Sequence, residues 1–149
     1  MKIVLDTNVL VSAFISKHGK PAALLDLILT FSEVQLIVSK PILEELESVL
    51  RRKEVRERFD YSVSDIKSFV RAVQKVSFKV KIKSSFKVVA EDPKDNLVLN
   101  TAYDGKADYV VSGDRHLKGL KEFKGVKIVN PTQMIDILRK EFGKFIFPS

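Results

Sequence analysis

Short apolar runs alternate with longer amphipathic runs along the whole chain, and this alternation restricts the fold more than any other feature. Short apolar runs are typical of buried strands, and apolar residues three or four positions apart are typical of helices. The alternation predicts a mostly parallel sheet covered by helices on both faces. The predicted strands are 2–5, 34–38, 78–89, 109–112 and 126–129. The predicted helices are 7–15, 21–31, 41–52, 63–76, 92–103 and 131–141. Their predicted caps include Ser39, either Ser62 or Ser64, and Asn130.

The composition excludes several kinds of site. The chain has 149 residues, which predicts one domain over 1–149, and it contains no Cys. The absence of Cys excludes disulfides, thiolate zinc sites and cysteine nucleophiles, and only 2 His argue against a site of several imidazoles. Lys and Arg outnumber Asp and Glu by 26 to 19, so the formal net charge is +7. No apolar run approaches the roughly 18 residues that span a bilayer, so we expect a cytoplasmic protein with no membrane partner.

Aspartates follow three of the predicted strands. Asp6 ends the first apolar run, Asp92 and Asp95 follow the long extended stretch, and Asp114 follows the next strand. The carboxyl ends of parallel strands share one edge of a sheet, and ligands bind there where the strand order reverses. If these strands are neighbours, Asp6, Asp95 and Asp114 converge on one cleft.

Carboxylates gathered in one cleft require a counter-charge. Two like charges about 4 Å apart repel by roughly 4 kcal/mol at an effective dielectric constant of 20, so such acids bind a cation or stay partly protonated. Oxygen ligands without thiolates or paired imidazoles select hard ions such as Mg²⁺ or Mn²⁺. Carboxylate-bound Mg²⁺ most often serves phosphoryl chemistry, where it activates water and neutralises the phosphate. The pattern therefore indicates metal-dependent chemistry on a phosphate ester.

The same acids also have a structural interpretation. Asp is a favoured helix N-cap, so each Asp taken singly is equally well explained as a cap. Their common edge of the sheet is what favours a functional interpretation. Among the glutamates of 41–52, Glu44 falls opposite the apolar stripe, whereas Glu45 and Glu47 flank it on its two sides. Spacing does not choose between Glu45 and Glu47, and a solvated helix face also explains both.

Four short blocks occur in a fixed order along nearly the whole chain. They read IVLDTNVL at 3–10, SKPILEEL at 39–46, DPKDN at 92–96, and SGD at 112–114 followed by His116 and Leu117. Together they resemble the PIN-domain family, the nuclease toxins of VapBC-type toxin–antitoxin pairs and their relatives. Alignment on the Leu after Glu45 selects that glutamate as the second acid of the family pattern.

The resemblance implies a three-layer α/β/α fold around a mostly parallel sheet, and a Mg²⁺- or Mn²⁺-dependent ribonuclease with no covalent intermediate. By similarity, the residues that hold the metals and position the attacking water are Asp6, Glu45, Asp95 and Asp114. Those that orient the site or touch the scissile phosphate are Thr7, Asn8 and Ser112. The family also implies RNA as substrate, a homodimer or higher homo-oligomer and, for a toxin, a cognate antitoxin protein.

Other segments leave questions open. Residues 55–87 match no family motif, so the substrate-binding region is not defined. Within 78–83, Lys alternates with apolar residues, which predicts a core face and a row of ammonium groups. This row is either a guarded edge strand or a strand that tracks phosphates. Arg115 is the better candidate for a phosphate contact near the metals, and His116 is expected in a surface or capping role rather than as a proton shuttle. The apolar tail 142–149 is expected to pack on its own sheet or to form a subunit contact.

Two other functions fit parts of the pattern. An aspartyl-phosphate phosphatase or receiver domain commonly has its acid in an Asp-x-Asp turn, but here the turn reads Asp6-Thr7-Asn8. A non-catalytic RNA-binding or scaffold module is the second alternative, and the presence of all four acids argues against it. The principal hypothesis is a metal-dependent ribonuclease that is the toxin of a toxin–antitoxin pair.

Overall fold

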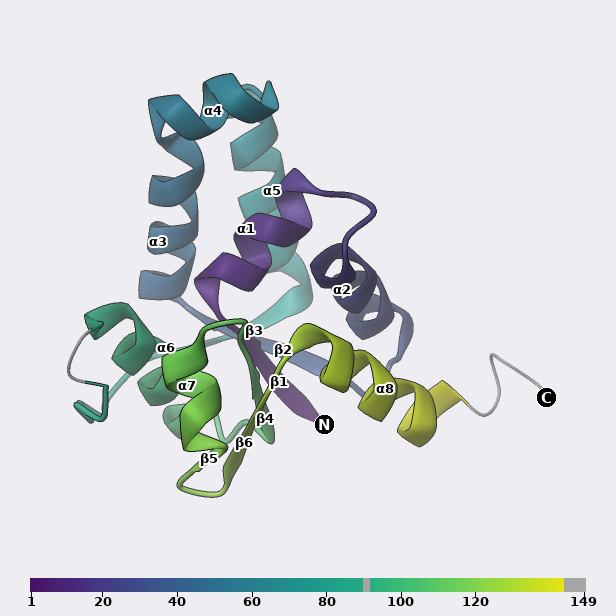
Figure 1. Ribbon diagram of the computed structural model, residues 1–149, viewed down its shortest axis with the longest axis vertical. Helices are drawn as coiled ribbons and strands as arrows, with labels where there is room; N and C mark the ends of the chain where they lie inside the picture. Colours follow the sequence, from purple (N-terminus) through teal and green to yellow (C-terminus); the bar gives the residue numbers. More distant parts are fainter. Residues whose placement is uncertain (90–91, 144–149) are drawn as a thin grey trace.

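A six-stranded sheet lies at the centre of the computed structural model, which describes residues 1–89 and 92–143 (Figure 1). The strand order is β3-β2-β1-β4-β6-β5. The strands are β1 (Lys2–Leu5), β2 (Gln35–Ser39), β3 (Ser77–Val80), β4 (Tyr109–Val111), β5 (Glu122–Phe123) and β6 (Val126–Val129). Neighbouring strands are parallel, except that β5 is antiparallel to β6. The sheet is therefore mostly parallel, as the sequence predicts.

Helices cover both faces of this sheet. They are α1 (Thr7–Ile15), α2 (Lys20–Thr30), α3 (Lys40–Arg51), α4 (Lys53–Phe59), α5 (Val63–Val76), α6 (Pro93–Asp104), α7 (Arg115–Leu120) and α8 (Pro131–Phe142). Figure 1 shows α6 and α7 on one side of the strands and α2 and α8 on the other, and α2 packs against α8. The arrangement is the three-layer α/β/α fold that the sequence predicts. No helix of the described ranges is long and apolar enough to span a membrane.

The strand order reverses beside β1. From β1 the chain first adds β2 and β3 on one side and then crosses to β4 and β6 on the other. The crevice outside the carboxyl ends of β1 and β4 is where open α/β sheets bind ligands. The residue after β1, Asp6, continues the pairing with β4, because its N–H donates to the carbonyl of Val111 at 3.0 Å. The fold thus places the first predicted acid at the point of reversal.

Most predicted elements are confirmed. β1, α1, α5 and β6 begin and end at the predicted residues, and α2, β2, α3, α6, β4 and α8 differ from the predictions by one residue at one or both ends. Ser62 rather than Ser64 caps α5, accepting the N–H of Asp65 at 3.1 Å, and Asn130 caps α8. The sequence analysis missed α4, α7 and β5, which have only 7, 6 and 2 residues and so carry little periodicity.

The predicted cap at Ser39 is only half correct. Ser39 is the N-cap residue of α3, but its hydroxyl makes no capping hydrogen bond. Instead, its Oγ lies 2.9 Å from Oγ1 of Thr101 on α6, where both side chains are buried. The second residue of α3 is Pro41, which has no N–H for a cap to accept. The hydroxyl therefore ties α3 to α6 rather than stabilising its own helix end.

The predicted strand at 78–89 is wrong over most of its length. β3 ends at Val80, and residues 81–89 form no regular strand. Phe78 is 61% exposed, so the expected apolar face does not belong to the core as a whole, although Val80 does. The reason is position, because β3 is the outermost strand of the sheet and has a neighbour on one side only. The edge-strand interpretation of the Lys row is confirmed for Lys79, whereas Lys81 and Lys83 lie beyond the end of the strand, and contact of the row with phosphates stays a prediction.

Residues 55–87 contribute largely to a helical arm. Figure 1 shows α3 and α5 side by side, with α4 joining them at the end farthest from the sheet. The hydroxyl of Tyr61 donates to the carbonyl of Leu50 at 2.7 Å and so fixes the turn between α4 and α5 on α3. Of the apolar tail at 142–149, Phe142 packs against Phe31 with ring centroids 5.8 Å apart. Residues 144–149 lie outside the described residues.

Candidate active site

Asp6, the residue between β1 and α1, is the first acid of the site. It is 4% exposed, and its Oδ1 accepts the N–H of Val9 at 3.1 Å, which caps α1. Its Oδ2 accepts the hydroxyl of Ser112 at 2.5 Å. Burial raises the pKa of Asp6, the Ser112 hydroxyl and nearby backbone N–H groups lower it, and the charge of Asp114 raises it, with a net increase. Asp6 is therefore both a helix cap and a carboxyl group whose ionisation is disfavoured.

Ser112 connects Asp6 to Asp114. It is fully buried after β4, and while its hydroxyl donates to Asp6, its Oγ accepts the N–H of Asp114 at 2.9 Å. The Oδ1 of Asp114 in turn accepts the N–H of His116 at 2.7 Å and caps α7. A continuous chain of hydrogen bonds thus fixes the carboxyl ends of β1 and β4 relative to each other.

Asp95 lies in the first turn of α6, opposite these strand ends. It is 6% exposed, and its Oδ2 is buried with no hydrogen-bond partner among the described residues. Burial, followed by the charges of Asp114, Asp92 and Asp6, raises the pKa of Asp95 to about 6, although the charge of His116 acts in the opposite direction. The structure thus brings Asp6, Asp95 and Asp114 into one interacting group. Their catalytic and metal-binding roles stay predictions.

The three glutamates of α3 have different surroundings. Glu44 is exposed, as predicted. Glu47 pairs with Arg51 of its own helix at 3.5 Å. Glu45 reaches α6 instead, where its Oε1 lies 2.8 Å from Nζ of Lys94, the residue before Asp95. The structure therefore distinguishes Glu45 from Glu47, which spacing alone did not, and links Glu45 to the other acids through Lys94.

Lys94 is the residue of this region that sequence analysis overlooked. Its partner Glu45 lies on a different helix, so neither helical spacing nor strand alternation relates the two positions. The only signal was the Lys inside the block DPKDN, between two acids.

The other predicted residues lie around the strand ends. Thr7 is buried in the first turn of α1, whereas Asn8, Arg115 and His116 are exposed. Asp92 caps α6 by accepting the N–H of Lys94 at 2.9 Å, which agrees with its structural interpretation. An exposed Arg115 directly after Asp114 is accessible to a phosphate group, as its predicted role requires.

The donor atoms suit a hard divalent cation. Among residues 1–89 and 92–143, no three acidic or histidine side chains stand close enough to hold a metal ion without rearrangement. One reason is that the carboxylates of Asp6 and Asp114 also serve as caps. All the candidate donors are nevertheless carboxylate oxygens, which Mg²⁺ and Mn²⁺ prefer, and Asp95 offers a buried oxygen with no hydrogen-bond partner in the described part of the chain. A cation would also offset the repulsion that raises the pKa of Asp95.

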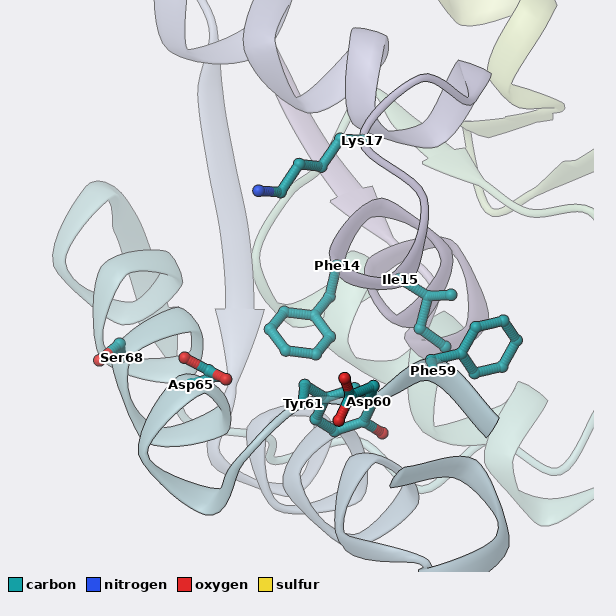
Figure 2. A pocket seen from close by; sticks show the side chains of 8 residues that line it. All are labelled: Phe14, Ile15, Lys17, Phe59, Asp60, Tyr61, Asp65 and Ser68. Atoms are coloured by element: carbon teal, nitrogen blue, oxygen red, sulfur yellow. The ribbon is translucent and has the colours of Figure 1, made fainter. Parts of the chain in front are cut away.

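A hollow of about 380 Å³ lies elsewhere, at the far end of α1 from Asp6. Figure 2 shows the rings of Phe14 and Tyr61 together in it, and their centroids are 4.8 Å apart in an edge-on arrangement. The charged residues that line it are Lys17, Asp60 and Asp65. This mixture of rings and opposite charges lacks the concentration of acids that distinguishes the strand ends.

Three comparisons with known proteins agree with this architecture. A family model described as PIN domain matches residues 2–116. The chain is 34% identical over 155 residues to the uncharacterized protein MJ1680 of Methanocaldococcus jannaschii, covering 98% of this chain and 94% of that protein. One chain of the crystal structure of VapBC2 from Rickettsia felis bound to a DNA fragment from their promoter is similar in fold, with a TM-score of 0.59 and 17% identity. That match covers 87% of this chain and 98% of the other.

Proposed function

Because this chain belongs to the PIN-domain family, we propose that it is a divalent-metal-dependent ribonuclease that hydrolyses phosphodiester bonds of RNA. The observation that carries the proposal is the buried oxygen of Asp95 that has no hydrogen-bond partner among the described residues, in a carboxyl group that feels the charges of Asp6 and Asp114. Leaving a buried acceptor unpaired costs about 1–3 kcal/mol, and more for a charged group. A bound divalent cation supplies the missing partner.

Each residue has a distinct task in the proposed reaction. Asp6, Asp95 and Asp114 hold the cation. Ser112 fixes Asp6 and Asp114 relative to each other through its two hydrogen bonds. Mg²⁺ or Mn²⁺ held by these carboxylates would supply an activated water molecule and a counter-charge for the scissile phosphate. Arg115, exposed beside Asp114, contacts the phosphate.

The remaining predicted residues support this centre. Thr7 and Asn8 in the first turn of α1 orient Asp6 or touch the phosphate, and Glu45 is the second acid of the family pattern. The formal net charge of +7 attracts RNA, and a bound cation would reduce the negative charge of the aspartates.

Cleavage of a mixed set of structured and single-stranded RNAs tests the proposal. Purified protein is incubated with Mn²⁺, Mg²⁺ or EDTA, beside Asp6→Asn and Asp114→Asn. We expect cleavage with either metal and none with EDTA. Both variants should lose about 100-fold or more, since loss of even an outer partner of a metal ligand costs about 10–100-fold.

Asp108→Asn is the matched control. Asp108 precedes β4, at the opposite end of the strand from Asp114, and its Oδ2 accepts the N–H of Lys2 at 2.8 Å. The Asp108→Asn variant should cleave RNA as the wild type does. Cleavage that needs no divalent metal, or that is unchanged in Asp6→Asn, would contradict the proposal. Binding of RNA without cleavage under all these conditions would favour the scaffold alternative.

We further propose that the nuclease is the toxin of a toxin–antitoxin pair. The supporting observation is the similarity in fold to a chain of the VapBC2 crystal structure. Expression in a bacterial host should arrest growth with the wild type and not with Asp6→Asn, and co-expression of a cognate antitoxin protein should restore growth. Growth unaffected by an active wild-type enzyme would favour RNA processing. A homodimer or higher homo-oligomer stays a prediction, which light scattering on the purified chain tests.

A further inference from the structure

We propose that an apolar groove between α6 and residues 81–89 binds an unpaired nucleobase of the RNA, beside the nucleotide that is cleaved. This inference rests on the proposed ribonuclease function and adds a binding site for the substrate to it. The groove has a volume of about 680 Å³, which lies within the roughly 300–1,000 Å³ of typical small-molecule sites.

The lining of the groove suits a flat, apolar ring. Ile82 and Phe86 line it from the segment after β3, and Pro93 and Leu97 line it from α6. Ile82, Phe86 and Leu97 are half-buried, so part of each side chain is open to a ligand. The Phe86 ring is fixed by edge-on contacts with two other aromatic rings, at centroid separations of 4.9 and 5.3 Å. Unpaired bases stack on walls of this kind, and every base has a flat face that can do so.

The polar groups of the groove favour contact with the face of a base rather than with its edge. Asn96 and Asn100 also line the groove, but their amides form hydrogen bonds with the backbone of Val89 and Phe86. These amides are therefore engaged within the protein instead of reading the edge of a base. We expect the groove to accept any base, so a homopolymer is a suitable probe.

Lysines beside the groove suit the phosphates that accompany a base. Lys87 lines the groove, Lys81 and Lys83 precede it on the same segment, and all three are exposed. Within residues 1–89 and 92–143, the ion pairs include none of these lysines. Ammonium groups beside an apolar wall complement a nucleotide, which joins a flat base to an anionic phosphate. An apolar peptide would gain little from them, so the charge favours RNA as the occupant.

The groove lies where a strand bound at the acids can reach it. Pro93 and Leu97 are four residues apart and share one face of α6, and at about 100° per residue Asp95 falls on the opposite face. The helix is only about 10–12 Å across with its side chains. A strand whose scissile phosphate lies at the acids therefore passes around the first turn of α6, and a neighbouring nucleotide places its base in the groove. In that turn Lys94 pairs with Glu45 at 2.8 Å, which offsets a charge that would repel the strand.

Fluorescence anisotropy with two short labelled probes tests this inference. One probe is oligo(U), and the other is a ribose–phosphate chain of the same length without bases. Both are titrated with the purified full-length chain in EDTA, so that metal-dependent cleavage does not occur. The wild type should bind oligo(U) about fivefold or more tightly than the abasic chain, because loss of one stacked base costs roughly 5- to 150-fold in affinity.

Variants of the groove locate the bound base. Ile82→Ala combined with Leu97→Ala should bind the two probes with nearly equal affinity, because the apolar walls are removed. Leu29→Ala changes an exposed leucine of α2 outside the groove, and it should keep the wild-type preference. Lys87→Gln should weaken the binding of both probes by a similar factor, since it removes a contact with phosphate only. Far-ultraviolet circular dichroism confirms folding, and Ile82→Ala alone, with a partial loss of preference, replaces the double variant if the latter does not fold.

Other outcomes would contradict the inference. Equal affinity of the wild type for both probes would overturn it and favour an apolar peptide as the occupant. A preference for oligo(U) that persists without the side chains of Ile82 and Leu97 would also overturn it, because the base would then bind elsewhere. Cleavage with Mn²⁺, measured on the same proteins, separates the inference from the proposed function. Binding of a base in the groove of a chain that never cleaves RNA would support the groove and contradict the nuclease, and cleavage without base-dependent binding would do the reverse.

Discussion

The two ends of α6 carry carboxyl groups with opposite properties. In the first turn, the Oδ2 of Asp95 has no partner among the described residues, and burial together with neighbouring acids raises its pKa. In the last turn, the Oδ2 of Asp104 accepts the N–H groups of Lys83 and Ser84 at 2.7 and 2.8 Å. Burial acts to raise the pKa of Asp104, but these hydrogen bonds outweigh it and the pKa is lowered. One helix thus contains both a buried carboxylate oxygen with no partner among the described residues and a carboxylate oxygen that accepts several hydrogen bonds.

Between these ends, two asparagines of α6 also form hydrogen bonds with the backbone of the preceding segment. Asn96, Asn100 and Asp104 lie four residues apart and so share one face of the helix. Asn100 accepts the N–H of Phe86 at 2.8 Å and donates to its carbonyl at 3.0 Å. Asn96 likewise accepts the N–H of Val89 and donates to its carbonyl, both at 2.8 Å. These side chains act as a second strand for residues 83–89, which form no regular strand of their own. The hydrogen-bonded polar groups of α6 therefore support the fold, and the Asp95 oxygen without a partner among the described residues lies where we propose that a cation binds.

The largest expected difference between the two ends is in catalysis. Asp95→Asn should lower RNA cleavage by about 100-fold or more, because it removes one charge from the proposed metal site while keeping the shape of the side chain. It should also raise the free energy of unfolding near neutral pH, since a disfavoured charge disappears. Asp104→Asn should cleave at a rate within about threefold of the wild type. Equal losses in the two variants, measured with the same RNA and Mn²⁺, would remove the functional distinction.

Among the changes in α6, substitution of Asn100 in the middle of the helix should lower the free energy of unfolding most. Asn100 is buried, and Asn100→Ala leaves the N–H and carbonyl of Phe86 without partners. We expect a loss of about 2–6 kcal/mol, at about 1–3 kcal/mol for each of these two groups. Urea unfolding measures this loss, and Gln74→Ala, which removes an exposed amide from α5, should change stability by less than about 0.5 kcal/mol. Cleavage per folded molecule should change far less than in Asp95→Asn. A loss below about 0.5 kcal/mol would mean that water replaces these hydrogen bonds.

The pH dependence of stability should have opposite signs at the two ends. The pKa of Asp95 is raised from 3.8 to about 6, so between these values the folded chain holds a proton that the unfolded chain has released. The free energy of unfolding should therefore fall as the pH rises through this window, relative to Asp95→Asn. Saturating Mg²⁺ should reduce this fall, because a cation favours the ionised carboxylate. The measurement is the difference between wild type and Asp95→Asn in urea unfolding from about pH 4 to about pH 7, and a constant difference would contradict the raised pKa.

Features of the fold and of the candidate site could be predicted from sequence where they depend on residues close together in the chain or on a general rule of sheet topology. Buried runs bounded by a polar residue, such as β1 before Asp6, were predicted with correct ends because burial and capping are local properties. The convergence of Asp6, Asp95 and Asp114 followed from the rule that parallel strands share one edge. The pairing of Lys94 with Glu45 did not follow, because it depends on how α3 and α6 are set against each other.

The sequence analysis missed the hydrogen-bonding face of α6, formed by Asn96, Asn100 and Asp104, for a different reason. The alternation at 78–83 favoured a long strand, and it drew attention away from three polar residues at four-residue spacing on the next helix. That spacing is a local signal for a polar helix face, but only the structure shows that the face meets backbone rather than water.

The smallest expected effect is that of Asp104→Asn, which tests the contribution of the Asp104 charge alone. Asp104→Asn keeps an oxygen that can accept the N–H groups of Lys83 and Ser84, so at neutral pH we expect a loss of less than about 1 kcal/mol, the difference between charged and neutral acceptors. Since the pKa of Asp104 is lowered in the folded chain, its contribution is present above the usual value of 3.8 and is lost as the pH falls through the lowered value. Urea unfolding of wild type and Asp104→Asn should therefore converge in acid. Convergence toward neutral pH instead would mean that Asp104 resembles Asp95, and that the two ends of α6 are not distinguished by their hydrogen bonds.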